Sequence, residues 1–134
     1  MKLRIRGDSV RLRLTRTEVA ALVASGHVSE RMHLPGGRHF EYRLAVDPLL
    51  ETPGALMEQG ALVVRLPKKM AESWAGSETV GIEAREANGK EEGLLILVEK
   101  DFPCLTPRAN EDDSDAFARP ASEQPPPCKV SESD

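Results

Sequence analysis

Basic side chains alternate with apolar ones at the start of this chain, and they are the residues best placed to do chemistry. They are Lys2, Arg4, Arg6, Arg11 and Arg13. Alternation puts every second side chain of an extended strand on one face, so these cations are expected to share a surface. Lys and Arg on such a surface bind phosphates, which predicts a site for nucleic acid or another polyanion. The alternative is a solvated outer face, because charges on edge strands also oppose aggregation.

The charge of the chain is uneven along its length. Of the formal net charge of −4 over 134 residues, residues 1–16 contribute +5, residues 17–100 contribute −4 and residues 101–134 contribute −5. The acidic average and the five aromatic residues argue against strong nucleic-acid binding, which uses positive charge and base stacking. We therefore expect a non-enzymatic binding or regulatory module that binds duplex DNA or another polyanion weakly through its basic start.

Two carboxylates near the end of the last expected strand raise an enzymatic alternative. Glu99 and Asp101 share a strand face and suit a divalent metal, while Arg and Lys would hold phosphates. This describes a metal-dependent phosphohydrolase of the triphosphate-tunnel type. The Glu-x-Glu-x-Lys strand that marks those enzymes is absent, since Glu83-Ala-Arg-Glu86 has a different spacing. We assign no catalytic residue to the chain.

Three histidines and one cysteine raise a zinc hypothesis: His27, His33, His39 and Cys104. Their spacing fits no compact structural zinc signature, although His33 and His39 flank a Pro-Gly-Gly turn that can bring them together. Cys104 has no neighbouring base in the sequence to activate its thiol, so a small buried hydrophobe is its expected role. The sequence assigns no metal site and no cofactor.

The elements that position these residues begin with two alternating runs, Lys2–Arg6 and Val10–Leu14, which predict a hairpin across Gly7-Asp8-Ser9. Thr15 and Glu18 match a capping box, so a helix is expected to start there and to stop at Gly26. Two further strands are expected near residues 28–34 and 39–46. A connection is expected over residues 47–60.

The second half repeats this order. A strand over residues 61–66, a short helix after Pro67, and a hairpin of residues 79–85 and 93–100 are expected. The pair Arg13-Leu14 recurs as Arg65-Leu66, and Val28 recurs as Val80 at the same offset. Such a period predicts two pseudo-repeats, with halves 9–46 and 61–100.

The expected fold is therefore α+β and β-rich. It has about seven mostly antiparallel strands in a barrel-like sheet with two short helices, within a single domain over residues 1–106. Residues 107–134 are rich in Pro, Ser, Asp and Glu and poor in aliphatic side chains. Such a composition buries too little apolar surface to offset its ordering entropy, which predicts a disordered acidic tail.

Two resemblances add to this interpretation. The opening KLRIRGDSVRLRLT and the closing LVEKDFPCLTPR resemble those of a family of short uncharacterised bacterial proteins, which implies no activity. The second half, through Leu66-Pro67, Gly76 and the strand 80–83, resembles the swapped-hairpin modules of AbrB-, MazE- and MraZ-type proteins. That resemblance implies an interlaced barrel, DNA binding through arginines, and an antitoxin-like alternative with a protein partner. The first half departs from the pattern, because Thr15 stands where proline is expected.

Other classes are excluded by composition. No stretch approaches the ~20 apolar residues of a membrane helix, and the start lacks the apolar segment of a secretory signal. Two cysteines give no disulfide framework, which favours a reduced, cytoplasmic location. The expected partners are a nucleic acid or other polyanion and a protein, and the expected state is a monomer or homodimer.

Overall fold

The computed structural model describes residues 1–102, which form eight strands and two helices. The first half holds β1 (Lys2–Ile5), β2 (Ser9–Leu14), α1 (Arg16–Ser25), β3 (His27–Leu34) and β4 (Arg38–Asp47). The second half holds β5 (Gly54–Glu58), β6 (Ala61–Pro67), α2 (Lys68–Ala75), β7 (Gly81–Glu86) and β8 (Leu94–Lys100). The predicted α+β, β-rich class is confirmed. The tail predicted over residues 107–134 and the predicted domain end at residue 106 lie outside the described residues.

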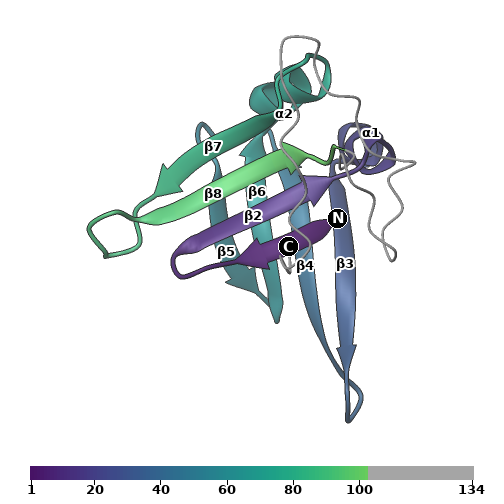
Figure 1. Ribbon diagram of the computed structural model, residues 1–134, viewed down its shortest axis with the longest axis vertical. Coiled ribbons are helices and arrows are strands. Elements are labelled where there is room, and N and C mark those ends of the chain that lie inside the picture. The colour runs from purple at the N-terminus through teal and green to yellow at the C-terminus, as the bar shows by residue number, and fades with distance from the viewer. Residues whose placement is uncertain (103–134) are drawn as a thin grey trace.

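Two mixed four-stranded sheets pack face to face, with both helices at one end (Figure 1). Sheet A has the strand order β1-β2-β8-β7, and sheet B has the order β3-β4-β6-β5. The outer pairs are antiparallel, whereas the central pairs, β2 with β8 and β4 with β6, are parallel. Each sheet therefore joins a hairpin of the first half to a hairpin of the second half.

The prediction of seven strands is wrong by one. The missed strand is β5, which lies within the segment expected to be a connection. It pairs antiparallel with β6, and only its first residue, Gly54, is buried. Its sequence Gly-Ala-Leu-Met-Glu shows no alternation of apolar and polar residues, so the periodicity that marks a half-buried strand is missing.

The predicted barrel is also wrong, because both sheets are open. In the part of the chain that the structure describes, no ladder joins β1 to β3 or β5 to β7. Side chains and chain ends make polar contacts across these two gaps instead: the Met1 ammonium pairs with Glu30 at 2.6 Å, and the Ala55 amide donates to Glu86 Oε1 at 2.8 Å. Closure needs an unbroken ladder, and the short edge strands β1 and β5 offer few backbone groups for one.

The order hairpin, helix, hairpin occurs twice, and the first hairpins of the two halves correspond at the predicted offset. Lys2 pairs with Arg13 in β1–β2, and Gly54 pairs with Arg65 in β5–β6. Gly54 follows Lys2, and Arg65 follows Arg13, by the same number of residues as Leu66 follows Leu14. The two helices start the same number of residues apart, at residues 16 and 68. The correspondence includes β1 and β5, which the predicted halves left out.

The second hairpins correspond at a slightly larger offset. Val28 pairs with Leu44 in β3–β4, and Ile82 pairs with Val98 in β7–β8. Ile82 follows Val28 by the same number of residues as Val98 follows Leu44. The predicted match of Val28 with Val80 is therefore wrong, and Ile82 takes that place. The reason is that the connection from α2 to β7 is longer than the one from α1 to β3.

Local signals at the helix ends are confirmed. Thr15 Oγ1 accepts a hydrogen bond from the Glu18 amide at 3.3 Å, and Glu18 Oε1 accepts one from the Thr15 amide at 2.9 Å. Gly26 ends α1 with a φ of +88°, the left-handed conformation that glycine adopts without a side-chain clash. Pro67 directly precedes α2. Among the described residues, no helix is long and apolar enough to cross a membrane.

The core lies between the two sheets and beneath the helices. Its fully buried side chains come from every layer: Leu12, Leu14, Leu22, Leu44, Val64, Leu66, Trp74, Ile96 and Val98. One charged residue also lies there, since Lys100 at the end of β8 is 6% exposed. Its Nζ donates to the Ser77 carbonyl at 2.6 Å and lies 5.9 Å from the centre of the Trp74 ring. Burial lowers the pKa of Lys100 below its usual value.

The correspondence between the halves predicts matched losses of stability. Leu14 and Leu66 occupy equivalent positions at the ends of β2 and β6, and both are fully buried. Leu14→Ala and Leu66→Ala should each lower the free energy of unfolding by about 2–5 kcal/mol, through lost burial and a residual cavity. Urea denaturation followed by circular dichroism measures both. Leu49→Ala, at a side chain 90% exposed, is the control and should change little. A loss at Leu14 or Leu66 no larger than the control would contradict the equivalence.

Candidate anion-binding face

The outer surface of sheet A gathers the predicted cations because the β1–β2 hairpin is in register. Lys2 lies directly opposite Arg13, and Arg4 lies directly opposite Arg11. Arg6 follows on the same side, where its backbone closes the turn through two hydrogen bonds with Ser9, both of 3.1 Å. We call Lys2, Arg4, Arg6, Arg11 and Arg13 the basic face.

Burial on β2 explains why these side chains point outward. Its alternate residues Val10, Leu12 and Leu14 are all buried and pack between the sheets. The side chains of Arg11 and Arg13 then lie on the other side, where they are 29% and 31% exposed. The sequence pattern therefore predicts the direction of the cations correctly.

Carboxylates at the end of β8 and on the residue after it partly neutralise the basic face. Glu99 Oε1 lies 3.4 Å from Arg11 Nε and 3.7 Å from Arg13 Nε, because Glu99 neighbours Arg13 in the parallel ladder. Asp101 pairs with Lys2 Nζ at 3.3 Å. The two carboxylates considered as metal ligands thus serve as partners of cations. Residues 1–102 contain no group of three or more His, Cys, Asp or Glu placed to hold a metal ion.

A hollow of about 360 Å³ adjoins Arg6, between the β1–β2 turn and the loop from β7 to β8. It brings in two cations that the sequence analysis missed, Arg85 and Lys90. Three carboxylates line it as well: Asp8, Glu91 and Glu92. Positive and negative groups are balanced there, so the hollow does not extend the basic face. Arg85 alternates with Glu83 along β7, but only the strand order of sheet A places it near Arg6.

The residues of the zinc hypothesis are only partly brought together. His33 and His39 are direct partners across β3–β4, and their ring centres lie 6.4 Å apart. His27 pairs with Ala45, at the opposite end of β3 from His33. Cys104 lies outside the described residues. The structure therefore joins two of these four residues.

The outer surface of sheet B shows a different balance of charge. Glu41 pairs with Arg31 at 3.2 Å and with Arg43 at 2.6 Å, and these guanidinium groups, Arg43 foremost, hold its pKa below the usual value. Arg65 pairs with Asp47 at 3.6 Å. On this surface three guanidinium groups thus pair with two carboxylates.

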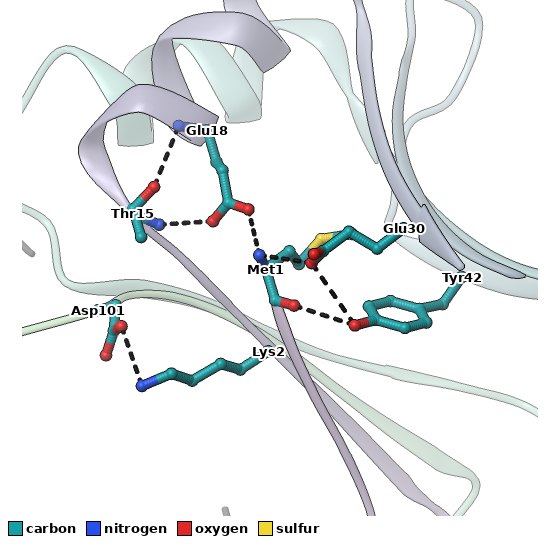
Figure 2. A network of polar contacts seen from close by, with 7 residues as sticks. All are labelled: Met1, Lys2, Thr15, Glu18, Glu30, Tyr42 and Asp101. Atoms are coloured by element: carbon teal, nitrogen blue, oxygen red, sulfur yellow. Dashed lines mark hydrogen bonds and ion pairs between the residues drawn. The ribbon is translucent and has the colours of Figure 1, made fainter. Parts of the chain in front are cut away.

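A polar network at Met1 fixes the start of β1 beside the basic face (Figure 2). The Met1 ammonium donates to Glu18 of α1 and pairs with Glu30 of β3 at 2.6 Å, while its carbonyl accepts from Tyr42 Oη of β4 at 3.1 Å. Glu18 is shared, since its other oxygen caps the helix at Thr15. Burial, and then the Glu30 carboxylate, raise the pKa of Tyr42. The network ties sheet A to α1 and sheet B.

This network predicts that the position of the ammonium matters for stability. One glycine added before Met1 would move the charge away from Glu18 and Glu30 and leave an amide in its place. The free energy of unfolding should fall by about 1 kcal/mol, a value that allows for the partial exposure of both carboxylates, 25% and 44%. Thermal denaturation compares this variant with a chain that carries one glycine after Asp134. Equal stability of the two chains would show that the ion pairs contribute nothing.

Comparison with known proteins bears on identity but not on activity. Residues 1–121 match a family described as a family of unknown function, DUF7009. No curated protein and no solved structure matches the chain. The expected membership of an uncharacterised family is thus confirmed, while the matched family offers nothing on the swapped-hairpin resemblance. Because the match covers most of its residues, the chain belongs to the family of unknown function DUF7009.

Proposed function

We propose that this chain is a non-enzymatic binding module whose basic face binds a polyanion, with duplex DNA as the first polyanion to test. The observation that carries the proposal is the register of the β1–β2 hairpin. It sets Lys2 against Arg13 and Arg4 against Arg11, two adjacent pairs of like charges on one surface.

Like charges directly opposite each other destabilise a sheet unless a counter-charge lies near. Asp101 pairs with Lys2, and Glu99 pairs with both Arg11 and Arg13. Arg11 and Arg13 share the single carboxylate Glu99, and their side chains stay 29% and 31% exposed. An external anion would add counter-charge at these two exposed arginines.

The shape of the surface favours an extended anion over a small one. The depression among Lys2, Leu3, Arg4, Arg11 and Arg13 measures only about 10 Å³, less than the space a small ligand needs. Cations on alternate residues of a strand stand about 7 Å apart, and the facing strand doubles the row. A strip of this kind suits a chain of repeated phosphates, whose contacts need charge and placement more than a pocket.

The other functions raised by the sequence gain less support. A triphosphate tunnel needs an enclosed barrel, whereas both sheets are open over the described residues, and Glu99 and Asp101 pair with cations. The antitoxin-like role depends on the tail, which lies outside the described residues, and stays a prediction.

Removing two facing arginines tests the proposal. We expect Arg4→Gln combined with Arg11→Gln to weaken binding of a labelled DNA duplex about tenfold at low salt and to reduce the slope of log affinity against log salt by about 2. Fluorescence anisotropy over a range of salt concentrations measures both. The control, Lys68→Gln with Lys69→Gln on exposed positions of α2, removes the same charge elsewhere. The proposal fails if the unaltered chain does not bind at low salt, binds independently of salt, or loses equally in the control.

The counter-charge Glu99 provides a test in the opposite direction. Glu99→Gln removes the carboxylate that Arg11 and Arg13 share, so both become more available to an anion. DNA affinity should rise about two- to fivefold, the range given by partly exposed ion pairs. Glu58→Gln in sheet B makes the same change of charge away from the basic face. An equal gain in both variants would mean that only net charge matters.

A further inference from the structure

The β3–β4 hairpin carries two histidines near its tip, beyond the rest of sheet B. The hairpin extends past the other strands of the molecule (Figure 1). The ladder of β4 with β6 starts at Glu41, so between Glu41 and the turn the two strands pair only with each other within the part of the chain that the structure describes. His33 and His39 lie in this two-stranded segment, and both are exposed. A dissolved ion can therefore reach both imidazoles.

The backbone of the hairpin sets these two imidazoles against each other. His33 and His39 are direct partners in the antiparallel ladder, one step away from the last pair before the turn. Direct partners project from the same face of a sheet, with Cβ atoms about 4.5–5.5 Å apart. The turn itself depends on Gly36 and Gly37, whose φ angles of +81° and +73° are left-handed and favour glycine. The hairpin therefore holds the two rings side by side without help from a ligand.

The distance between the rings suits the coordination of one metal ion. Their centres lie 6.4 Å apart, and the ring planes are inclined by 50°. Two imidazoles that bind one tetrahedral zinc ion through Zn–N bonds of about 2.0–2.1 Å have ring centres about 5 Å apart. Small rotations of two exposed side chains close this difference of about 1 Å, because the second side-chain torsion of histidine is broad.

The neighbouring charges on the same face are already paired. The next ladder pair towards the body of the sheet is Arg31 with Glu41, and these side chains pair with each other at 3.2 Å. Glu41 is also held by Arg43 at 2.6 Å. Within residues 1–102 no group of three or more His, Cys, Asp or Glu is placed to hold a metal ion, so a metal here would have two imidazole ligands. Its other coordination positions are open, unlike those of a structural zinc site.

We propose that His33 and His39 form a binding site for a divalent cation of the zinc class, with coordination positions left for water or a further ligand. Imidazole suits Zn²⁺, Ni²⁺ and Cu²⁺, whereas Mg²⁺ and Ca²⁺ prefer oxygen ligands. The site uses neither the basic face nor a polyanion, so it is independent of the proposed function. A bound metal joins the two strands and stabilises a two-stranded segment, which has little stability of its own.

Calorimetric titration of the full chain with ZnCl₂ tests this site. Every chain carries Cys104→Ser and Cys128→Ser, which removes the thiols as competing ligands. His33→Ala and His39→Ala should each weaken the binding of Zn²⁺ at least about tenfold, because one ring alone cannot chelate the ion. The matched control is His27→Ala, an exposed histidine at the other end of β3, which should leave the affinity unchanged. MgCl₂ should neither bind to the site nor displace Zn²⁺.

A second measurement locates the metal on the rings. The nitrogen chemical shifts of the His33 and His39 imidazoles should change when Zn²⁺ is added, whereas those of His27 should not. The proposal is overturned if the chain binds no Zn²⁺, if the His33 and His39 variants bind as tightly as the control, or if these ring shifts stay the same. A loss of affinity in only one of the two variants also overturns it, because the site requires both rings.

Discussion

Two parallel ladders, β2 with β8 and β4 with β6, are the pairings on which the rest of the structure depends. Each stands at the centre of its sheet and joins strands from different halves of the chain. Neither half holds both strands of a central ladder, so neither can build a four-stranded sheet from its own residues. Leu14 and Val98 in sheet A, and Leu44 and Leu66 in sheet B, are completely buried on these strands. The core therefore exists only where the halves meet.

The electrostatics of the basic face follow from the same arrangement. Its cations come from one short hairpin at the start of the chain, while Glu99 and Asp101 come from the end of β8 and the residue after it. The ladder sets Arg13 beside Glu99 and so brings the two groups together. A surface whose cations are local in sequence and whose counter-charges are distant can be compensated from within the chain or from outside it.

How much the sequence predicts depends on how far apart the interacting residues lie. The β1–β2 hairpin, the direction of its cations and the Thr15–Glu18 capping box all arise from near neighbours in the sequence and are predicted correctly. Strand β5 escapes prediction because its apolar residues do not alternate with polar ones. The barrel prediction fails because edge closure is a property of the whole strand order. The partnership of Arg11 with Glu99 needs the register of β2 with β8, which no local pattern contains.

That register also affects how the chain folds while it is being synthesised. Ladder partners in sheet B, such as Glu41 and Ala61, are close in the sequence, whereas most of the described chain separates Ser9 from Leu95 in sheet A. Distant contacts carry a larger loop-closure cost and slow the search for the native pairing. All four strands of sheet B precede β8 in the sequence, so the β1–β2 hairpin emerges from the ribosome long before its ladder partner β8. A lone hairpin is at best marginally stable in water, which makes this interval the one in which a nascent chain most needs protection.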